Sequence, residues 1–102
     1  MQEKRVHPRV TVQIPVVCET QSGESIAGVA RDISLGGIFV ESSNSPPFGT
    51  SVTVVGALPG LSGEAKLPGI VRWGKPGGFG VQFGLLGARE THAITKLLRS
   101  HS

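Results

Sequence analysis

Two short groups of polar residues in this chain have the residue types and the spacing to bind an anionic ligand. Arg5 and Arg9 lie four positions apart near the N-terminus, and Lys4 stands directly before Arg5. Further along, residues 32–37 read D-I-S-L-G-G. Guanidinium groups pair with phosphates and carboxylates, and a clustered excess of basic residues attracts anions. An ionised Asp only accepts hydrogen bonds, whereas a Ser hydroxyl both donates and accepts them.

Each group, taken alone, also has a purely structural interpretation. Three of the ten Lys and Arg residues fall within the first nine positions, which is equally the pattern of an ordinary solvated basic terminus. Asp32 and Ser34 can cap a turn in which Gly36 and Gly37 supply backbone of positive φ. These interpretations stay open until the surrounding pattern is considered.

The composition indicates one folded domain over residues 1–102. Hydrophobic residues make up 38% of the chain and there are 15 glycines, whereas a disordered chain has fewer apolar residues and more charge. No apolar run approaches the ~18 residues that a membrane span needs. A secretory leader has an apolar region directly after its basic N-terminal residues, and this sequence shows none there. We therefore expect a cytoplasmic protein without membrane insertion.

The residues that usually carry catalysis or bind metals are few and scattered. Cys18, the one cysteine, lies in a strand pattern and suits a buried apolar position better than a nucleophilic one. The three histidines, at positions 7, 92 and 101, have no metal-ligand spacing with it. No nucleophile motif accompanies Asp32 and Ser34. We expect a protein that is not an enzyme and has no metal or cofactor.

Alternating apolar and polar residues predict the strands that must position the polar groups. The clearest alternation covers residues 10–18, 65–73 and 79–83, and shorter strands are expected at 26–31, 37–41 and 50–55. Apolar residues at i, i+3 and i+4 then predict an amphipathic helix over 88–99. Short strands at intervals of about ten residues, followed by one helix, indicate a mainly β fold, a small barrel or a strongly curved sheet.

Five aromatic residues are available to the core or to a ligand. The alternation places Trp73 on the side of Leu67 and Val71, which favours a core position, and a position where its ring stacks on a ligand stays open beside it. We interpret all four phenylalanines as core residues. This leaves too few aromatics for a small barrel that binds single-stranded nucleic acid, which interleaves aromatic and basic side chains, so no nucleic-acid partner is expected.

In this order, and ahead of this strand pattern, the two polar groups resemble the signature of the PilZ domain family, bacterial receptors for the second messenger cyclic di-GMP. The signature R-x-x-x-R followed by D/N-x-S-x-x-G is matched by Arg5, Arg9, Asp32, Ser34 and Gly37. The resemblance extends to V-R-W at 71–73 and G-V-Q-F at 80–83, and so covers residues 4–99. It implies a six-stranded antiparallel PilZ-type β-barrel with a C-terminal α-helix.

The resemblance also implies that the five signature residues bind cyclic di-GMP. Arg5 and Arg9 would engage the O6 and N7 atoms of guanine or the two phosphates. Asp32 would accept from the N1–H and N2–H₂ donors of guanine, and Ser34 would donate to a phosphate or a base acceptor. Gly37, which lacks a Cβ, would let the backbone approach the ligand. Weaker candidates for ligand contact are Lys4, Gly36 and Trp73.

These roles predict two parts within a single domain. Residues 1–9 would form a flexible segment that clamps the ligand, and residues 10–102 would form the barrel with its helix. The leading hypothesis is a receptor that closes residues 1–9 over cyclic di-GMP and signals through a partner protein, which the sequence does not identify. The alternative is an adaptor of the same fold that binds proteins without responding to nucleotide.

Overall fold

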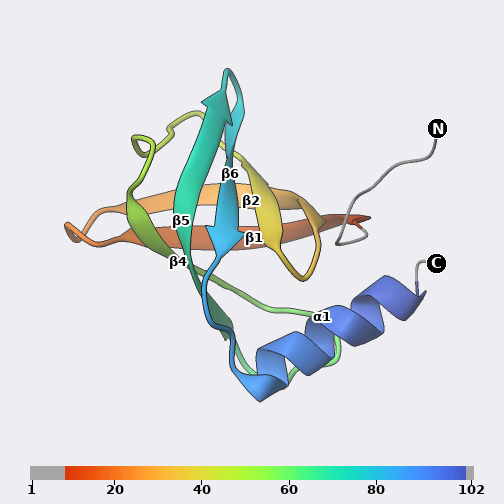
Figure 1. Ribbon diagram of the computed structural model, residues 1–102. Helices are drawn as coiled ribbons and strands as arrows, with labels where there is room; N and C mark the ends of the chain where they lie inside the picture. Colours follow the sequence, from red (N-terminus) through yellow and green to blue (C-terminus); the bar gives the residue numbers. More distant parts are fainter. Residues whose placement is uncertain (1–8, 101–102) are drawn as a thin grey trace, which may run out of the picture.

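A computed structural model describes residues 9–100 of the chain. Within them the chain forms six strands and one helix (Figure 1): β1 (Val10–Thr20), β2 (Ser25–Ile33), β3 (Gly37–Glu41), β4 (Ser51–Gly56), β5 (Ala65–Lys75), β6 (Gly78–Phe83) and α1 (Ala88–Ser100). The strands close into a barrel in the order β1-β2-β3-β6-β5-β4, and all neighbours are antiparallel. The expected six-stranded antiparallel barrel with a C-terminal helix is confirmed. Within residues 9–100, no helix has the length and apolar character to cross a bilayer.

Alternation along the strands builds the barrel interior. In β1 every second side chain from Ile14 to Thr20 is buried, and in β5 the same holds from Ala65 to Val71. Cys18 is completely buried, and because burial disfavours the thiolate, it raises the pKa of Cys18 to about 11. Cys18 therefore packs as a small apolar residue, in agreement with the expectation.

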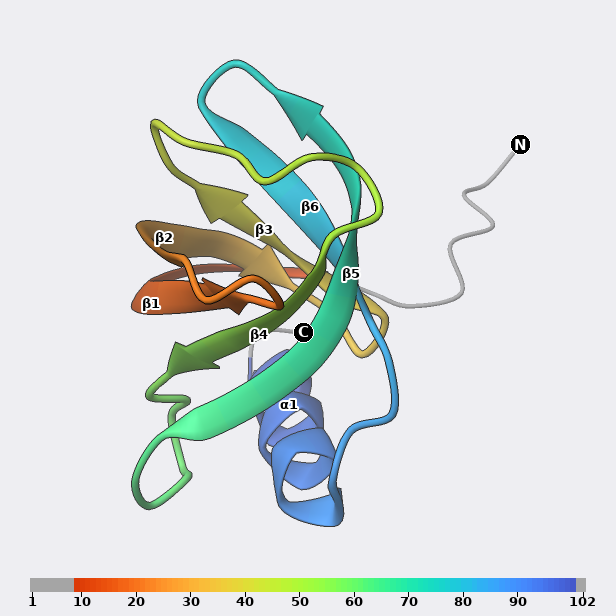
Figure 2. The same cartoon turned by 90° about the vertical axis from the view of Figure 1, so that its left-hand side faces the viewer.

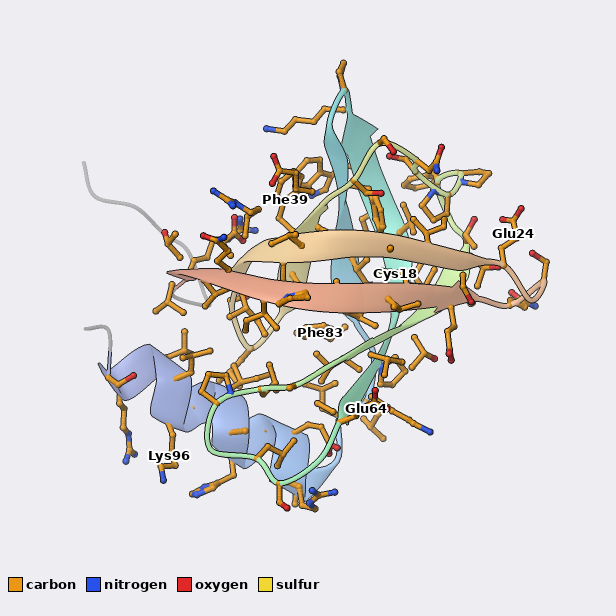
Figure 3. The ribbon with its side chains drawn as sticks, turned by 180° about the vertical axis from the view of Figure 1, so that it is seen from behind. Cys18, Glu24, Phe39, Glu64, Phe83 and Lys96 are labelled. Carbon is orange, nitrogen blue, oxygen red and sulfur yellow. The ribbon has the colours of Figure 1, made fainter. Side chains whose placement is uncertain are left out.

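The helix covers one end of this barrel. Ala93, Ile94 and Leu97 of α1 are buried in the same cluster as the barrel interior, which includes Phe83. Figure 3 shows Phe83 between the strands and α1. In Figure 1 the β5–β6 hairpin projects from the end opposite α1, and Figure 2 shows the long, bent β5 running from that hairpin towards the helix. The helix thus completes the core, and the hairpin marks the other end.

The interpretation of all four phenylalanines as core residues is wrong for two of them. Phe79 and Phe83 are buried, but Phe48 in the loop between β3 and β4 is 71% exposed. Phe39 lies half-buried on the outer face of β3, because its two neighbours in the strand both point into the barrel and successive side chains alternate. Figure 3 shows Phe39 on the outside of the barrel.

Three register shifts interrupt the strand pairing: one lies in β1 between Thr11 and Ile14, and the two that shape the outer face lie in β2 and β5. The register of β2 against β3 shifts at Arg31, and the register of β5 against β6 shifts at Arg72. Each bulge inserts one extra residue, so the residue that follows it changes face. Asp32 and Trp73 consequently lie on the outer surface, which decides between the two alternatives for Trp73: it is outside the core.

Candidate ligand-binding site

One row of paired residues crosses four strands on the outer face of the barrel. Asp32 on β2 pairs with Phe39 on β3, Phe39 pairs with Gly80 on β6, and Gly80 pairs with Trp73 on β5. Directly paired residues point their side chains to the same face of a sheet. The row therefore contains, in this order, an acidic side chain, an aromatic ring, a glycine and a second aromatic ring.

The two rings of this row stack on each other across the glycine. The ring centroids of Phe39 and Trp73 are 5.3 Å apart and their planes are inclined by 9°, a separation within the usual range for stacked aromatic pairs. The Lys75 ammonium lies 5.1 Å from the centroid of Phe39, which adds a cation–π contact. Trp73 is nevertheless 42% exposed. The stack therefore leaves part of the indole accessible from solvent.

A charged pair flanks the aromatic stack. Arg9 Nη1 donates to Asp32 Oδ1 over 3.2 Å, and the two side chains are 43% and 29% exposed. A second, longer pair joins Arg31 and Glu41, whose Nη1 and Oε1 atoms are 3.7 Å apart. The structure thus brings together one signature residue from the N-terminal group and one from the D-x-S-x-x-G group, 23 positions apart.

These side chains line an open pocket of about 540 Å³. Its lining consists of Arg9, Arg31, Asp32, Phe39, Glu41, Trp73, Lys75, Pro76 and Gly77. Three cations stand against two carboxylates, next to a partly exposed indole. Such a combination of a flat apolar surface with a few convergent polar groups suits an anionic ligand that carries an aromatic base.

Ser34 and Gly36 form the β2–β3 loop after Asp32 and are not among the residues that line the pocket. Ser34 is only 4% exposed, and its Oγ accepts from the backbone N–H groups of Gly36 and Gly37 over 3.1 and 3.2 Å. The Ser34 N–H donates in turn to the Gly37 carbonyl over 2.9 Å. The segment is therefore a hydrogen-bonded turn, although neither glycine has the positive φ expected of it.

Gly37 is required by the contact between β3 and β6. A Cβ at this position would lie 2.5 Å from the carbonyl oxygen of Val81, a backbone atom of the neighbouring strand. No side chain larger than hydrogen fits there without moving the strands apart. Packing of the barrel wall therefore gives a sufficient reason for this glycine of the signature.

Lys4 and Arg5 lie outside the described residues, so Arg9 alone of the basic group is placed by the structure. Conversely, Phe39, Lys75 and Arg31 line the pocket although sequence reasoning did not assign them to it. These residues reach the pocket through the register of neighbouring strands, and no pattern in the sequence reveals that register. Within residues 9–100, no cluster of three His, Cys, Asp or Glu side chains is placed to hold a metal ion.

Comparison with known families agrees with this arrangement. The family model for the PilZ domain matches residues 3–100, which is nearly the whole chain. The chain belongs to the PilZ domain family. The matched region contains the Arg9–Asp32 pair and the complete four-strand row of this PilZ domain. No sequence match to a functionally curated protein accompanies the family match.

Three solved structures resemble this PilZ domain in fold at low sequence identity. The inhibitor of motility MotI from Bacillus subtilis superposes with a TM-score of 0.80 at 19% identity, over 97% of this chain and 51% of that one. The PilZ domain of CeSA from a cellulose-synthesizing bacterium gives 0.73 at 23% identity, over 91% and 96%. The PilZ domain of YcgR from Escherichia coli, solved with c-di-GMP, gives 0.73 at 12% identity, over 97% and 92%. The present chain thus spans about half the length of the MotI chain.

Proposed function

We propose that this PilZ domain is a receptor for cyclic di-GMP and binds it in the pocket between the Arg9–Asp32 pair and the Phe39–Trp73 stack. The observation that carries the proposal is the meeting of these two pairs in one pocket, which combines donors, an acceptor and a stacking surface. The likeness to the YcgR domain, which was solved with c-di-GMP, supports the same ligand.

Recognition of guanine would rest on Asp32 and Arg9. Of the two carboxylate oxygens of Asp32, Oδ1 accepts a hydrogen bond from Arg9, and Oδ2 accepts none from residues 9–100. Oδ2 is therefore available to the N1–H and N2–H₂ donors of a guanine edge. Arg9 can turn from Asp32 to the O6 and N7 acceptors of the base or to a phosphate, because its planar fork fits both. The exposed part of the Trp73 indole offers a surface on which the base can stack.

The charge of the pocket suits the two phosphodiesters of cyclic di-GMP. Arg9, Arg31 and Lys75 line it, and Lys4 and Arg5 would add charge when residues 1–9 close over the ligand. Closure of that segment would present a new surface, which a partner protein could then recognise. The function proposed is therefore non-catalytic: a ligand-dependent change of surface that is passed to another protein.

Direct binding tests this proposal. Labelled cyclic di-GMP should bind and be displaced by unlabelled ligand, whereas GTP, a short oligonucleotide and cyclic di-AMP, whose adenines lack the N1–H and N2–H₂ donors, should not displace it. Thermal unfolding gives a second measure, since a ligand that binds only the native state stabilises it by about 2.7 kcal/mol at a hundredfold excess over Kd. An unchanged melting temperature and no retained label would instead support the alternative, a PilZ-fold adaptor that does not respond to nucleotide.

A further inference from the structure

Both outward-facing positions at the start of β6 are glycines, and aromatic rings occupy the space above them. Gly78 is paired with Glu41 and Lys75, and Gly80 is paired with Phe39 and Trp73. A strand with side chains at these two positions would hold the neighbouring rings apart, since paired residues share a face. Here the rings of β3 and β5 instead lean across β6 and meet.

The space above Gly80 is occupied by the indole of Trp73. A Cβ built at Gly80 would overlap three atoms of that ring, Cε2, Nε1 and Cζ2, and these are its nearest neighbours. A Cβ at Gly78 would instead overlap both Phe39 and a backbone carbonyl. At Gly80 a single methyl group would therefore meet the indole first, whereas at Gly78 it would meet a ring and the backbone at similar distances.

Phe39 restrains the indole from β3, on the other side of β6. Its ring lies parallel to Trp73 within 9°, and Lys75 packs on the Phe39 ring in turn. Trp73 thus has the β6 backbone at Gly80 on one side and Phe39 on another. An indole held in this way loses little conformational freedom when a base stacks on it, and such preorganisation increases affinity.

We propose that Gly80 and Phe39 are positioning residues that hold the Trp73 indole as a preformed stacking surface for a base of the ligand. The inference rests on the proposed function, because it needs cyclic di-GMP to occupy this pocket. It goes beyond that function because it predicts that Gly80, which has no side chain, and Phe39, which orients the Trp73 ring, both contribute to ligand affinity.

The fluorescence of Trp73 provides a readout for the test. Trp73 is the one tryptophan and there is no tyrosine, so tryptophan fluorescence and its quenching by acrylamide report on this indole alone. The test variants are Gly80→Ala and Phe39→Leu. Gly74→Ala is the matched control, because Gly74 lies in the same hairpin and a Cβ there would meet no heavy atom closer than 3.9 Å.

Gly80→Ala and Phe39→Leu should each change the emission and the quenching of Trp73 and weaken cyclic di-GMP binding by about 5- to 150-fold, the range for losing one base–aromatic stack. Gly74→Ala should bind like the parent. Phe39→Tyr keeps an aromatic ring and should restore affinity to within about twofold of the parent, since ring stacking is retained. Far-ultraviolet circular dichroism and the melting temperature verify that each variant is folded.

The outcomes separate this inference from the proposed function. A folded Gly80→Ala variant that alters Trp73 emission and still binds as tightly as the parent would overturn the positioning role and leave the receptor function standing. An unaltered Trp73 signal in both test variants would overturn it as well. Failure of the parent itself to bind cyclic di-GMP would overturn the proposed function and this inference together. If Gly80→Ala does not fold, Phe39→Leu and Phe39→Tyr decide alone.

Discussion

Arg9 and Asp32, which both line the pocket, pair with each other across 3.2 Å. Both side chains are partly exposed, and exposed pairs of this kind contribute only about 0–1 kcal/mol to stability. The Arg9–Asp32 ion pair can therefore be replaced by contacts with a ligand at little cost in stability. A guanine can take over either partner, and a phosphate can take over Arg9. Variants at these positions should therefore separate binding from stability.

Arg9→Ala should weaken cyclic di-GMP binding by at least tenfold, because a lost charge-assisted hydrogen bond costs about 1.5–3 kcal/mol. Its melting temperature should stay close to that of the parent, since only an exposed ion pair is removed. Calorimetric titration and thermal unfolding measure the two effects. Arg72→Ala is the matched control, because Arg72 donates to Gln82 outside the pocket. Parent-like affinity of Arg9→Ala would remove Arg9 from the site.

Asp32→Ala should weaken binding more than Asp32→Asn does. The amide keeps one oxygen acceptor for the guanine donors, whereas alanine keeps none, and the family signature accepts Asn at this position. Competition between cyclic di-GMP and cyclic di-AMP sharpens the test, since loss of the acceptor should reduce the preference for guanine. If the alanine variant retains both affinity and preference, guanine is not recognised through Asp32.

Ser34→Ala should lower stability as well as affinity. It removes the Oγ acceptor from the N–H groups of Gly36 and Gly37, and a buried donor left without a partner costs about 1–3 kcal/mol. For a domain of this size each 1 kcal/mol lowers the melting temperature by about 4–8 °C. Circular dichroism should still show a folded barrel. A variant with unchanged stability and reduced affinity would instead support direct contact between Ser34 and the ligand.

Gly37→Ala should act mainly on folding. Its Cβ would meet the Val81 carbonyl at 2.5 Å, and overpacking of this kind costs about 1–3 kcal/mol. Chemical denaturation measures the loss, with Gly84→Ala as the control, since a Cβ at Gly84 has no neighbour closer than 3.9 Å. Full stability together with lost binding would mean that this glycine makes room for the ligand rather than for β6.

Limited trypsin digestion with mass spectrometry tests the proposed closure of residues 1–9 over the ligand. Cleavage after Arg5 and Arg9 should slow when cyclic di-GMP is bound, because a clamped backbone cannot enter the protease. Cleavage after Arg89, in the first turn of α1, should stay slow throughout and reports global unfolding. In Asp32→Ala the ligand should give no protection. Unchanged cleavage after Arg5 and Arg9, with ligand bound to the parent, would rule out the clamp.

Much of the fold was predictable from the sequence because its signals are local. Alternation over residues 65–71 and an i, i+3, i+4 pattern over 94–98 reflect the periods of a strand and a helix, and both elements are present as expected. The polar signature likewise located Asp32 and Arg9, which the structure brings into contact. The signature also names Gly37, whose part in ligand binding stays a prediction; the contact with Val81 that requires a glycine there is with another strand.

The sequence by itself determined the six strands, the helix and the polar residues of the signature. The tertiary structure decided which faces of the strands meet in the pocket. These faces depend on the bulges, and a bulge is defined by pairing with a neighbouring strand, so the sequence of its own strand does not locate it. The bulge at Arg72 turned Trp73 outward against its apparent pattern, and the one at Arg31 set Asp32 opposite Phe39. Phe39, Gly80 and Trp73 form one surface because the β5–β6 hairpin pairs in register with β3, which lies far from it in the chain.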